Sequence, residues 1–138
     1  MDNLQYINQL AQFNLILVKD NFVLTSNKKG ISPMIDFIDE NVDLKGFYAF
    51  DIIVGKAVAS LFILAGIVEV YGKVMSKSAH ELLSKYGIKH SYGTLTDNII
   101  NRTNTGICPM ELTVANSDNI NEMHSLLKCK LKELKGEK

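Results

Sequence analysis

The stretch FYAFDIIVGKAVASLFILAGIVEVYGKVM, residues 47–75, decides the fold. Its first seven residues are apolar except for Asp51, and they predict a buried strand. The middle part, GKAVASLFILAG, predicts a helix that ends at Gly66, because glycine readily takes the left-handed conformation that closes a helix. VEVYGKVM then predicts a second strand. A short helical crossover returns the chain in the same direction, so the two strands are expected to pair in parallel.

The flanking segments extend this pattern. Downstream, a further helix is expected to close at Gly87 before the strand IKHSYG, residues 88–93. Upstream, LILVKD and FVLTSN predict a hairpin that turns at Asp20 and Asn21. Three more helices are expected: one within residues 1–13, one that starts at Ser32 and Pro33 and runs to about Glu40, with Ser32 as its capping hydroxyl, and one over residues 118–134.

These elements predict an α/β protein. We expect a three-layer α/β/α sandwich around a mixed sheet, because helices alternate with strands and only the hairpin is antiparallel. A chain of 138 residues has the usual size of one domain, so residues 1–138 are expected to form a single unit.

Composition narrows the functional classes. The formal net charge is zero and there is no uninterrupted basic run, so neither a nucleic acid polymer nor a membrane is an expected partner. The most apolar stretch is too short to span a bilayer. Two cysteines provide no disulfide framework, and no signal peptide is recognisable, which favours a reduced, cytoplasmic protein.

VGKA, residues 54–57, lies where a strand leads into a helix. Backbone N–H groups point outward at such a helix start, so Gly55 and Lys56 are candidate ligands for a phosphate or carboxylate. The alternative is a packing glycine beside a surface lysine. Asp51 is a candidate catalytic residue that would pair with Lys56 at the carboxyl end of its strand, or else a solvent-facing or helix-capping carboxylate.

GICPME, residues 106–111, is a second candidate site. Pro109 suits the first position of a helix, which makes Cys108 the N-cap and allows Glu111 to reach back to the Cys108 amide. That arrangement is purely structural. Alternatively, Cys108 is a reactive thiol activated by the helix start, or Glu111 is a general acid or base.

The loop before it holds two more candidates. Arg102 offers a planar fork for carboxylate or phosphate, and Asn101 offers a donor and an acceptor, so both are assigned to ligand binding. The alternative is that these side chains satisfy the backbone of their own loop.

The run from residue 43 to 76, together with INR (residues 100–102) and GICPME, resembles a family of small prokaryotic proteins of unknown function with a cytidine-deaminase-like fold. The resemblance implies a deaminase-like pocket and suggests a homodimer, for which the apolar helix near residues 57–66 is a candidate interface. It also implies where zinc ligands would lie, but those positions are occupied by Gly55, Lys56, Ser76, Lys77 and Ser78. Zinc chemistry in such proteins requires His or Cys ligands and a Glu, so no metal or other cofactor is expected.

Two functions follow as expectations. The first is metal-independent binding or processing of a nucleotide or similar small anionic metabolite, with Asp51, Cys108 and Glu111 as candidate catalytic residues. The second is a non-enzymatic regulatory or protein-interaction module with a degenerate deaminase fold. The sequence does not decide whether the protein is an enzyme.

Overall fold

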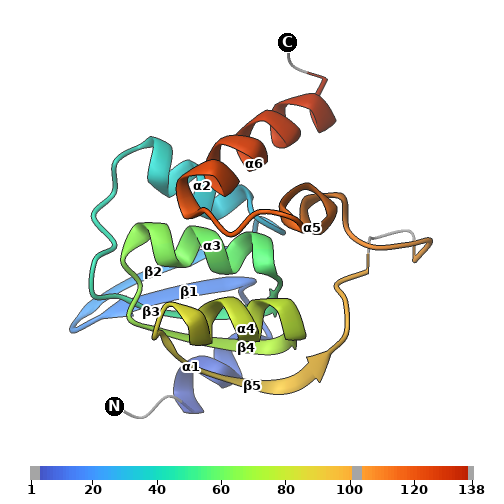
Figure 1. Ribbon diagram of the computed structural model, residues 1–138. Helices are drawn as coiled ribbons and strands as arrows, with labels where there is room; N and C mark the ends of the chain where they lie inside the picture. Colours follow the sequence, from blue (N-terminus) through green and yellow to red (C-terminus); the bar gives the residue numbers. More distant parts are fainter. Residues whose placement is uncertain (1–3, 101–103, 137–138) are drawn as a thin grey trace.

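The computed structural model describes residues 4–100 and 104–136 (Figure 1). In chain order its elements are α1 (Leu4–Gln9), β1 (Leu15–Lys19), β2 (Phe22–Ser26), α2 (Ser32–Asp39), β3 (Tyr48–Val54), α3 (Lys56–Ala65), β4 (Glu69–Ser76), α4 (Lys77–Lys85), β5 (Lys89–Thr96), α5 (Pro109–Val114) and α6 (Ile120–Leu134).

The five strands form one mixed sheet in the order β2-β1-β3-β4-β5. β1 pairs antiparallel with both β2 and β3, whereas β3, β4 and β5 run parallel to one another. The predicted mixed α/β sheet and its parallel units are therefore confirmed. The hairpin also turns where expected, and Asp20 adopts the positive φ of 53° that tight turns demand and that Asp tolerates.

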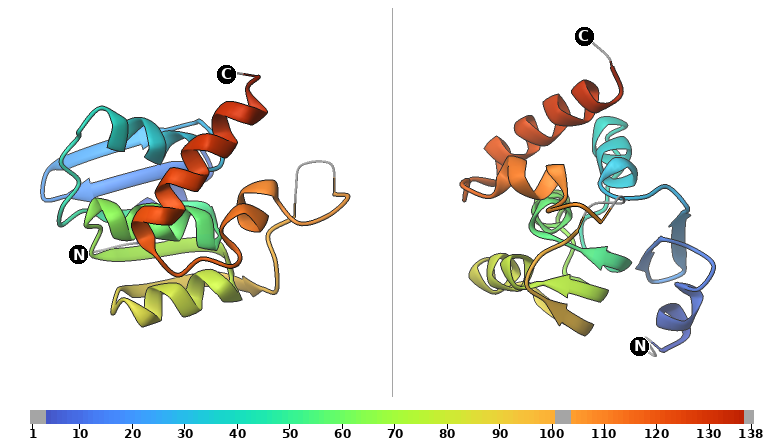
Figure 2. Two further views of the ribbon diagram at one scale, coloured as in Figure 1. Left: turned by 45° about the horizontal axis from the view of Figure 1, so that its top comes forward. Right: turned by 90° about the vertical axis from the view of Figure 1, so that its right-hand side faces the viewer.

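Apolar side chains cover both faces of the sheet. On one face, residues of α1 pack on Ile16, Val18 and Phe50. On the other face, a larger cluster joins β1, β3 and β4 to α2, α3, α4, α5 and α6. Figure 2 shows the same division, with α1 on the side of the sheet away from the other helices.

The helix α3 lies in the middle of the larger cluster. Six consecutive residues from Ala57 to Phe62 are buried, and Gly66 closes the helix with φ of 85°, as predicted. Full burial of a large apolar side chain such as Phe62 contributes about 1.5–3 kcal/mol, so this helix anchors the fold. Most of its apolar surface is used within the chain, and its role as a subunit interface stays a prediction.

One predicted helix start also differs from the structure. The helix α2 has Ile31, not Ser32, at the N-cap position, and no side chain caps its first turn. Ser32 and Pro33 already belong to the first turn, where the fixed φ of proline is favourable. Among the described residues, no helix is long and apolar enough to cross a membrane.

Candidate functional site

The site centres on the start of α3, where β3 ends and Gly55 occupies the N-cap. Both oxygens of the Glu111 carboxylate bind this helix start. Oε1 accepts a hydrogen bond from the Lys56 amide and Oε2 accepts one from the Ala57 amide, each at 2.8 Å. A helix start has unpaired N–H groups and a partial positive charge, so a carboxylate in this position satisfies both.

Gly55 permits this close approach. A Cβ atom at this position would lie 2.5 Å from Cδ and 2.7 Å from Oε2 of Glu111, closer than carbon and oxygen atoms can approach. The glycine has φ of −98°, which any residue can adopt, so the requirement for glycine comes from the carboxylate and not from the backbone.

Lys56 extends the connection between α3 and α5. Its Nζ donates to the Ala115 carbonyl oxygen at 3.2 Å and lies 3.9 Å from Oδ1 of Asp118. Only 12% of the lysine side chain is exposed. VGKA and GICPME, more than fifty residues apart in sequence, therefore meet in one charged contact at the junction of α3 and α5.

Burial governs the electrostatics of Glu111. Desolvation raises the pKa of this carboxyl, and the hydrogen bonds from Ala57 and Lys56, together with the Lys56 charge, oppose that shift. The carboxyl is thus held by the helix start but accepts a proton more readily than an exposed glutamate.

Cys108 is the N-cap of α5 and Pro109 its first residue, as predicted. The capping role assigned to Glu111 is wrong, however. The Cys108 amide donates to the Ile99 carbonyl oxygen at 2.9 Å, while Glu111 turns toward α3. Cys108 is half-buried and packs against the larger apolar cluster. This contact favours a structural role for the thiol.

Asp51 is buried, with 8% of its surface exposed. It lies opposite Leu15 in the antiparallel pair with β1, so it shares the sheet face that carries α3. Burial raises its pKa to about 8, against the opposing effect of hydrogen bonds from the Ile52 and Ile53 amides. No ion pair among the described residues joins Asp51 to Lys56, whose ammonium group instead faces Asp118. The predicted Asp51–Lys56 pair is wrong, and so are the solvent-facing and helix-capping alternatives for Asp51.

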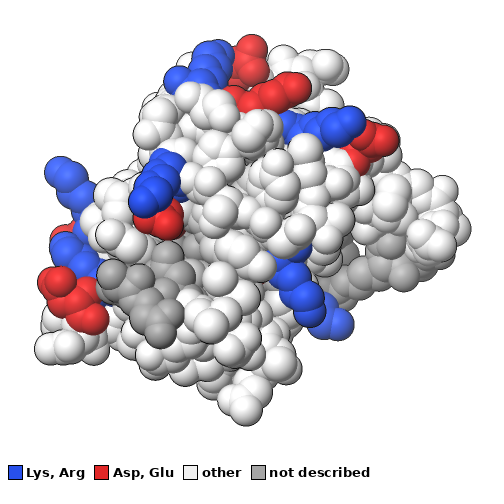
Figure 3. All heavy atoms as spheres, turned by 90° about the horizontal axis from the view of Figure 1, so that it is seen from below, with Lys and Arg blue, Asp and Glu red and all other residues white. Residues whose placement is uncertain are grey.

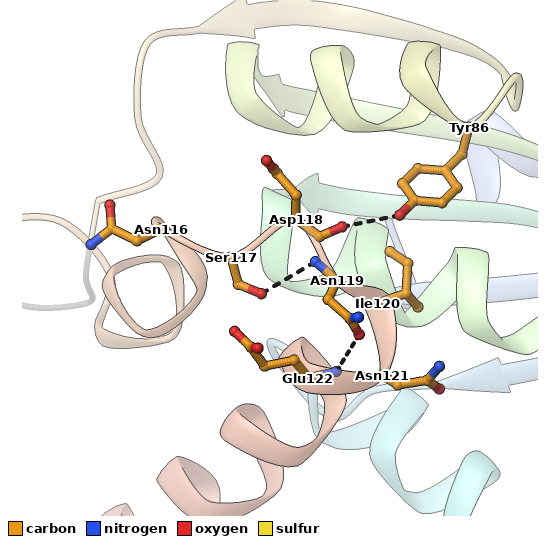
Figure 4. A pocket seen from close by; sticks show the side chains of 8 residues that line it. All are labelled: Tyr86, Asn116, Ser117, Asp118, Asn119, Ile120, Asn121 and Glu122. Carbon is orange, nitrogen blue, oxygen red and sulfur yellow. Dashed lines mark hydrogen bonds between the residues drawn. The ribbon is translucent and has the colours of Figure 1, made fainter.

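A polar hollow of about 680 Å³ lies beside this junction (Figure 4). The segment between α5 and α6 forms one wall, and Tyr86 at the end of α4 forms another. The Tyr86 hydroxyl donates to the Asp118 carbonyl oxygen at 3.0 Å, and Asn119 caps α6 by accepting from the Glu122 amide at 2.9 Å. Amides and carboxylates line the hollow, so it suits a ligand with hydroxyl or amino groups.

The positions that the resemblance assigns to zinc ligands do not fit a metal. At the start of α4, Ser76 accepts a hydrogen bond from the Ala79 amide at 3.1 Å and lies 3.1 Å from the Ser78 hydroxyl. At the start of α3, Gly55 has no side chain and Lys56 is a cation. Within the described parts of the chain, no group of three or more His, Cys, Asp or Glu residues could hold a metal ion.

Two predicted ligand-binding residues, Asn101 and Arg102, lie outside the described residues. Sequence reasoning also missed two contacts. It did not foresee that Glu111 binds α3, because a separation of 55 residues carries no periodic signal. It found no close pair of metal-binding side chains, whereas His80 Nδ1 and His90 Nε2 lie 2.8 Å apart.

Comparison with known proteins agrees with the fold. A crystal structure of a DUF1893 family protein, TM1506, from Thermotoga maritima superimposes with a TM-score of 0.83 at 24% sequence identity, covering 93% of this chain and 87% of that one. No curated protein matches the sequence. Residues 5–131 match the family described as "TM1506: Domain of unknown function (DUF1893)". The chain therefore belongs to the DUF1893 family, as the resemblance to a family of unknown function predicted.

Proposed function

We propose that this protein binds a small anionic metabolite of the nucleotide class, without a metal, at the start of α3. The observation that carries the proposal is the Glu111 carboxylate on the Lys56 and Ala57 amides. Glu111 acts there as an internal anion, which the ligand replaces.

Phosphate and carboxylate share the feature that this helix start recognises. Each presents two oxygens that can accept from neighbouring amides, and each is favoured by the positive end of the helix dipole. Gly55 has no side chain of its own, so the space that the Glu111 carboxylate now fills could hold such a group once the carboxylate is displaced. A ligand phosphate would therefore find two donors already aligned.

Lys56 and the polar hollow would bind the part of the ligand that lies beyond its phosphate or carboxylate. The Lys56 ammonium group faces Asp118, which lines the hollow, so this lysine connects the helix start to it. The ionisable lining groups of the hollow are Tyr86, Asp118 and Glu122, and their acidity disfavours a second phosphate there. A sugar or a base, with hydroxyl and amino groups, suits the hollow better, and this favours a nucleotide-like molecule.

Processing of the ligand would rest first on Glu111. Burial at the helix start raises the pKa of its carboxyl, so Glu111 takes up a proton more readily than an exposed glutamate and would exchange one with the ligand that displaces it. Cys108, three residues before Glu111 at the N-cap of α5, is the candidate nucleophile. A catalytic role for Asp51 requires a ligand that reaches the buried face of β3.

We also propose that the fold is a three-layer α/β/α sandwich like that of the cytidine deaminases. The helices on both sheet faces and the meeting of VGKA with GICPME support it. Homodimer formation and a cytoplasmic location remain predictions. A nucleic acid polymer or a membrane is not part of the proposal, and on the face seen in Figure 3 acidic and basic side chains lie in small groups of both signs.

One observation favours the alternative, a non-enzymatic regulatory or interaction module. Glu111 and Lys56 are both satisfied within the chain, as expected for residues that simply hold α5 against α3. In that case the same contacts are structural, and no small anion displaces the carboxylate.

A thermal-shift screen separates the two functions. Wild-type protein and Glu111→Ala are heated with inorganic phosphate, nucleoside monophosphates, sugar phosphates and dicarboxylates. A ligand at a hundred times its dissociation constant adds about 2.7 kcal/mol of stability, which is readily detected. The proposal expects stabilisation by a phosphate-bearing compound, stronger in Glu111→Ala. If none of these anions stabilises either protein, the binding function is wrong.

A further inference from the structure

His80 and His90 form a pair of imidazoles on a different part of the surface. His80 belongs to α4 and His90 to β5, the strand at the edge of the sheet (Figure 1). Nδ1 of His80 and Nε2 of His90 lie 2.8 Å apart, and the ring centroids are separated by 4.9 Å. Both side chains are only partly buried, so solvent and ions reach them.

A backbone contact orients one of the two rings. Nδ1 of His90 lies 2.7 Å from the Ile88 carbonyl oxygen. A carbonyl only accepts, so Nδ1 carries the proton, and in neutral His90 the lone pair is on Nε2, which faces His80. Metal-binding histidines commonly donate their second ring nitrogen to a carbonyl in this way.

The separation of the two nitrogens suits two adjacent ligands of one ion. Imidazole nitrogens bind late first-row divalent ions at about 2.0–2.1 Å, which places two ligands at a right angle about 2.9 Å apart. A tetrahedral site would separate them by about 3.3 Å. The 2.8 Å contact is itself a hydrogen bond between the two rings, and the two nitrogens need little movement to reach the right-angled spacing that is typical of Ni²⁺ or Cu²⁺.

We propose that His80 and His90 form a two-histidine binding site for a late first-row divalent metal ion. His80 Nδ1 and His90 Nε2 are the ligands, and water completes the coordination. On binding, the proton of the neutral His80 ring moves from Nδ1 to Nε2, so no net proton is released. The site is separate from the start of α3, because His90 lies opposite Val70 near the amino ends of the parallel strands.

Calorimetric titration of untagged, reduced protein with Ni²⁺ tests the proposal. The chain contains three histidines, so His124→Ala is a matched control for His80→Ala and His90→Ala. We expect one Ni²⁺ per wild-type chain, unchanged affinity in His124→Ala, and affinity at least tenfold weaker in each variant of the pair. Equal affinity in all four proteins, or no binding by the wild type, would overturn the proposal.

Two measurements on the wild type avoid any dependence on how the variants fold. In nitrogen-detected imidazole spectra, Zn²⁺ should shift His80 Nδ1 and His90 Nε2 and leave His124 unchanged. With Co²⁺, the absorption spectrum should lack a thiolate charge-transfer band. Such a band would assign the ion to Cys108 or Cys129, and a shift confined to His124 would place it elsewhere; either result contradicts the proposal.

Discussion

Gly55 and Glu111 depend on each other although they are 56 positions apart in the sequence. The carboxylate occupies the space that any side chain at position 55 would need. Neither residue type suggests this relation alone, because a glycine after a strand and a glutamate in a first helical turn are both common. Together they explain why VGKA and GICPME, the two motifs that carry the resemblance, contact each other.

Gly55→Ala is expected to lower the free energy of unfolding by about 1–3 kcal/mol, because the new methyl group overlaps the carboxylate. In the Glu111→Ala background the same substitution should cost about 1 kcal/mol less, since the overlap is gone. Urea denaturation of the four proteins measures this coupling. Gly106→Ala, where an added Cβ has no neighbour within 4 Å, is the control. Equal costs in both backgrounds would show that the carboxylate does not impose the glycine.

Asp51 should make stability depend on pH. Its carboxyl has a pKa of about 8 when folded and about 3.9 when unfolded, so between these values the folded state keeps a proton that the unfolded state has lost. This contribution to stability is complete below about pH 4, falls as pH rises, and is lost above about pH 8. Asp51→Asn removes this titration, so the variant does not lose the stability that the wild type loses as pH rises. The free energy of unfolding of the variant minus that of the wild type should therefore increase by several kcal/mol between pH 5 and pH 8.

Urea denaturation at both pH values measures the effect of Asp51→Asn. The exposed Asp97, which pairs with Lys77 on the surface, provides the control substitution Asp97→Asn, because exposed ion pairs contribute little. A stability difference for Asp51→Asn that does not change with pH would mean that Asp51 is ionised in the folded protein.

At the scale of elements, the sequence predicts most helices and strands because their signals are local. Gly66 marks the end of α3, Pro109 the start of α5, and the pair Asp20 and Asn21 the hairpin turn. The prediction fails where a contact joins distant elements. Ser32 does not cap α2, and Glu111 caps α3 instead of its own helix. Such choices depend on packing between helices, which no local pattern encodes.

Lys56 should control how firmly α5 is attached. Lys56→Met keeps the aliphatic stem but removes the bond to the Ala115 carbonyl oxygen, at an expected cost of about 1–2 kcal/mol. Hydrogen exchange in α5, for example at Leu112, should accelerate more than in α6. Lys132→Met, at an exposed position of α6, is the control. Unchanged exchange in α5 would show that the lysine does not hold the two helices together.

The N-cap of α5 makes a prediction about thiol reactivity. Cys108 is half-buried against the core, whereas Cys129 is exposed. Because alkylation requires access to the thiolate, iodoacetamide at neutral pH should label Cys129 faster than Cys108. Mass spectrometry of the two peptides gives both rates in one sample. Faster labelling of Cys108 would identify it as an activated nucleophile and favour the catalytic form of the proposed function.

At the scale of the whole molecule, the sheet brings together groups that the sequence keeps far apart. Because β3 and β4 are parallel, the helices α3 and α4 both start at the carboxyl ends of these strands. The chain returns to the same end of the sheet through α5, which brings Glu111 to the start of α3. The sequence predicts seven site residues, of which five are described, and three of these, Gly55, Lys56 and Glu111, are in contact. It could not show that the anion at this helix start belongs to the chain itself.

An amide NMR titration tests most directly whether Glu111 is a displaceable anion. Wild type, Glu111→Ala and the control Glu133→Ala are titrated with the phosphate compound that stabilises the protein most. The account predicts that the Lys56 and Ala57 amide signals shift at saturation, and that Glu111→Ala binds at least tenfold more tightly than wild type and Glu133→Ala, a difference of about 1.4 kcal/mol. Unmoved Lys56 and Ala57 signals, or equal affinities in all three proteins, would contradict it.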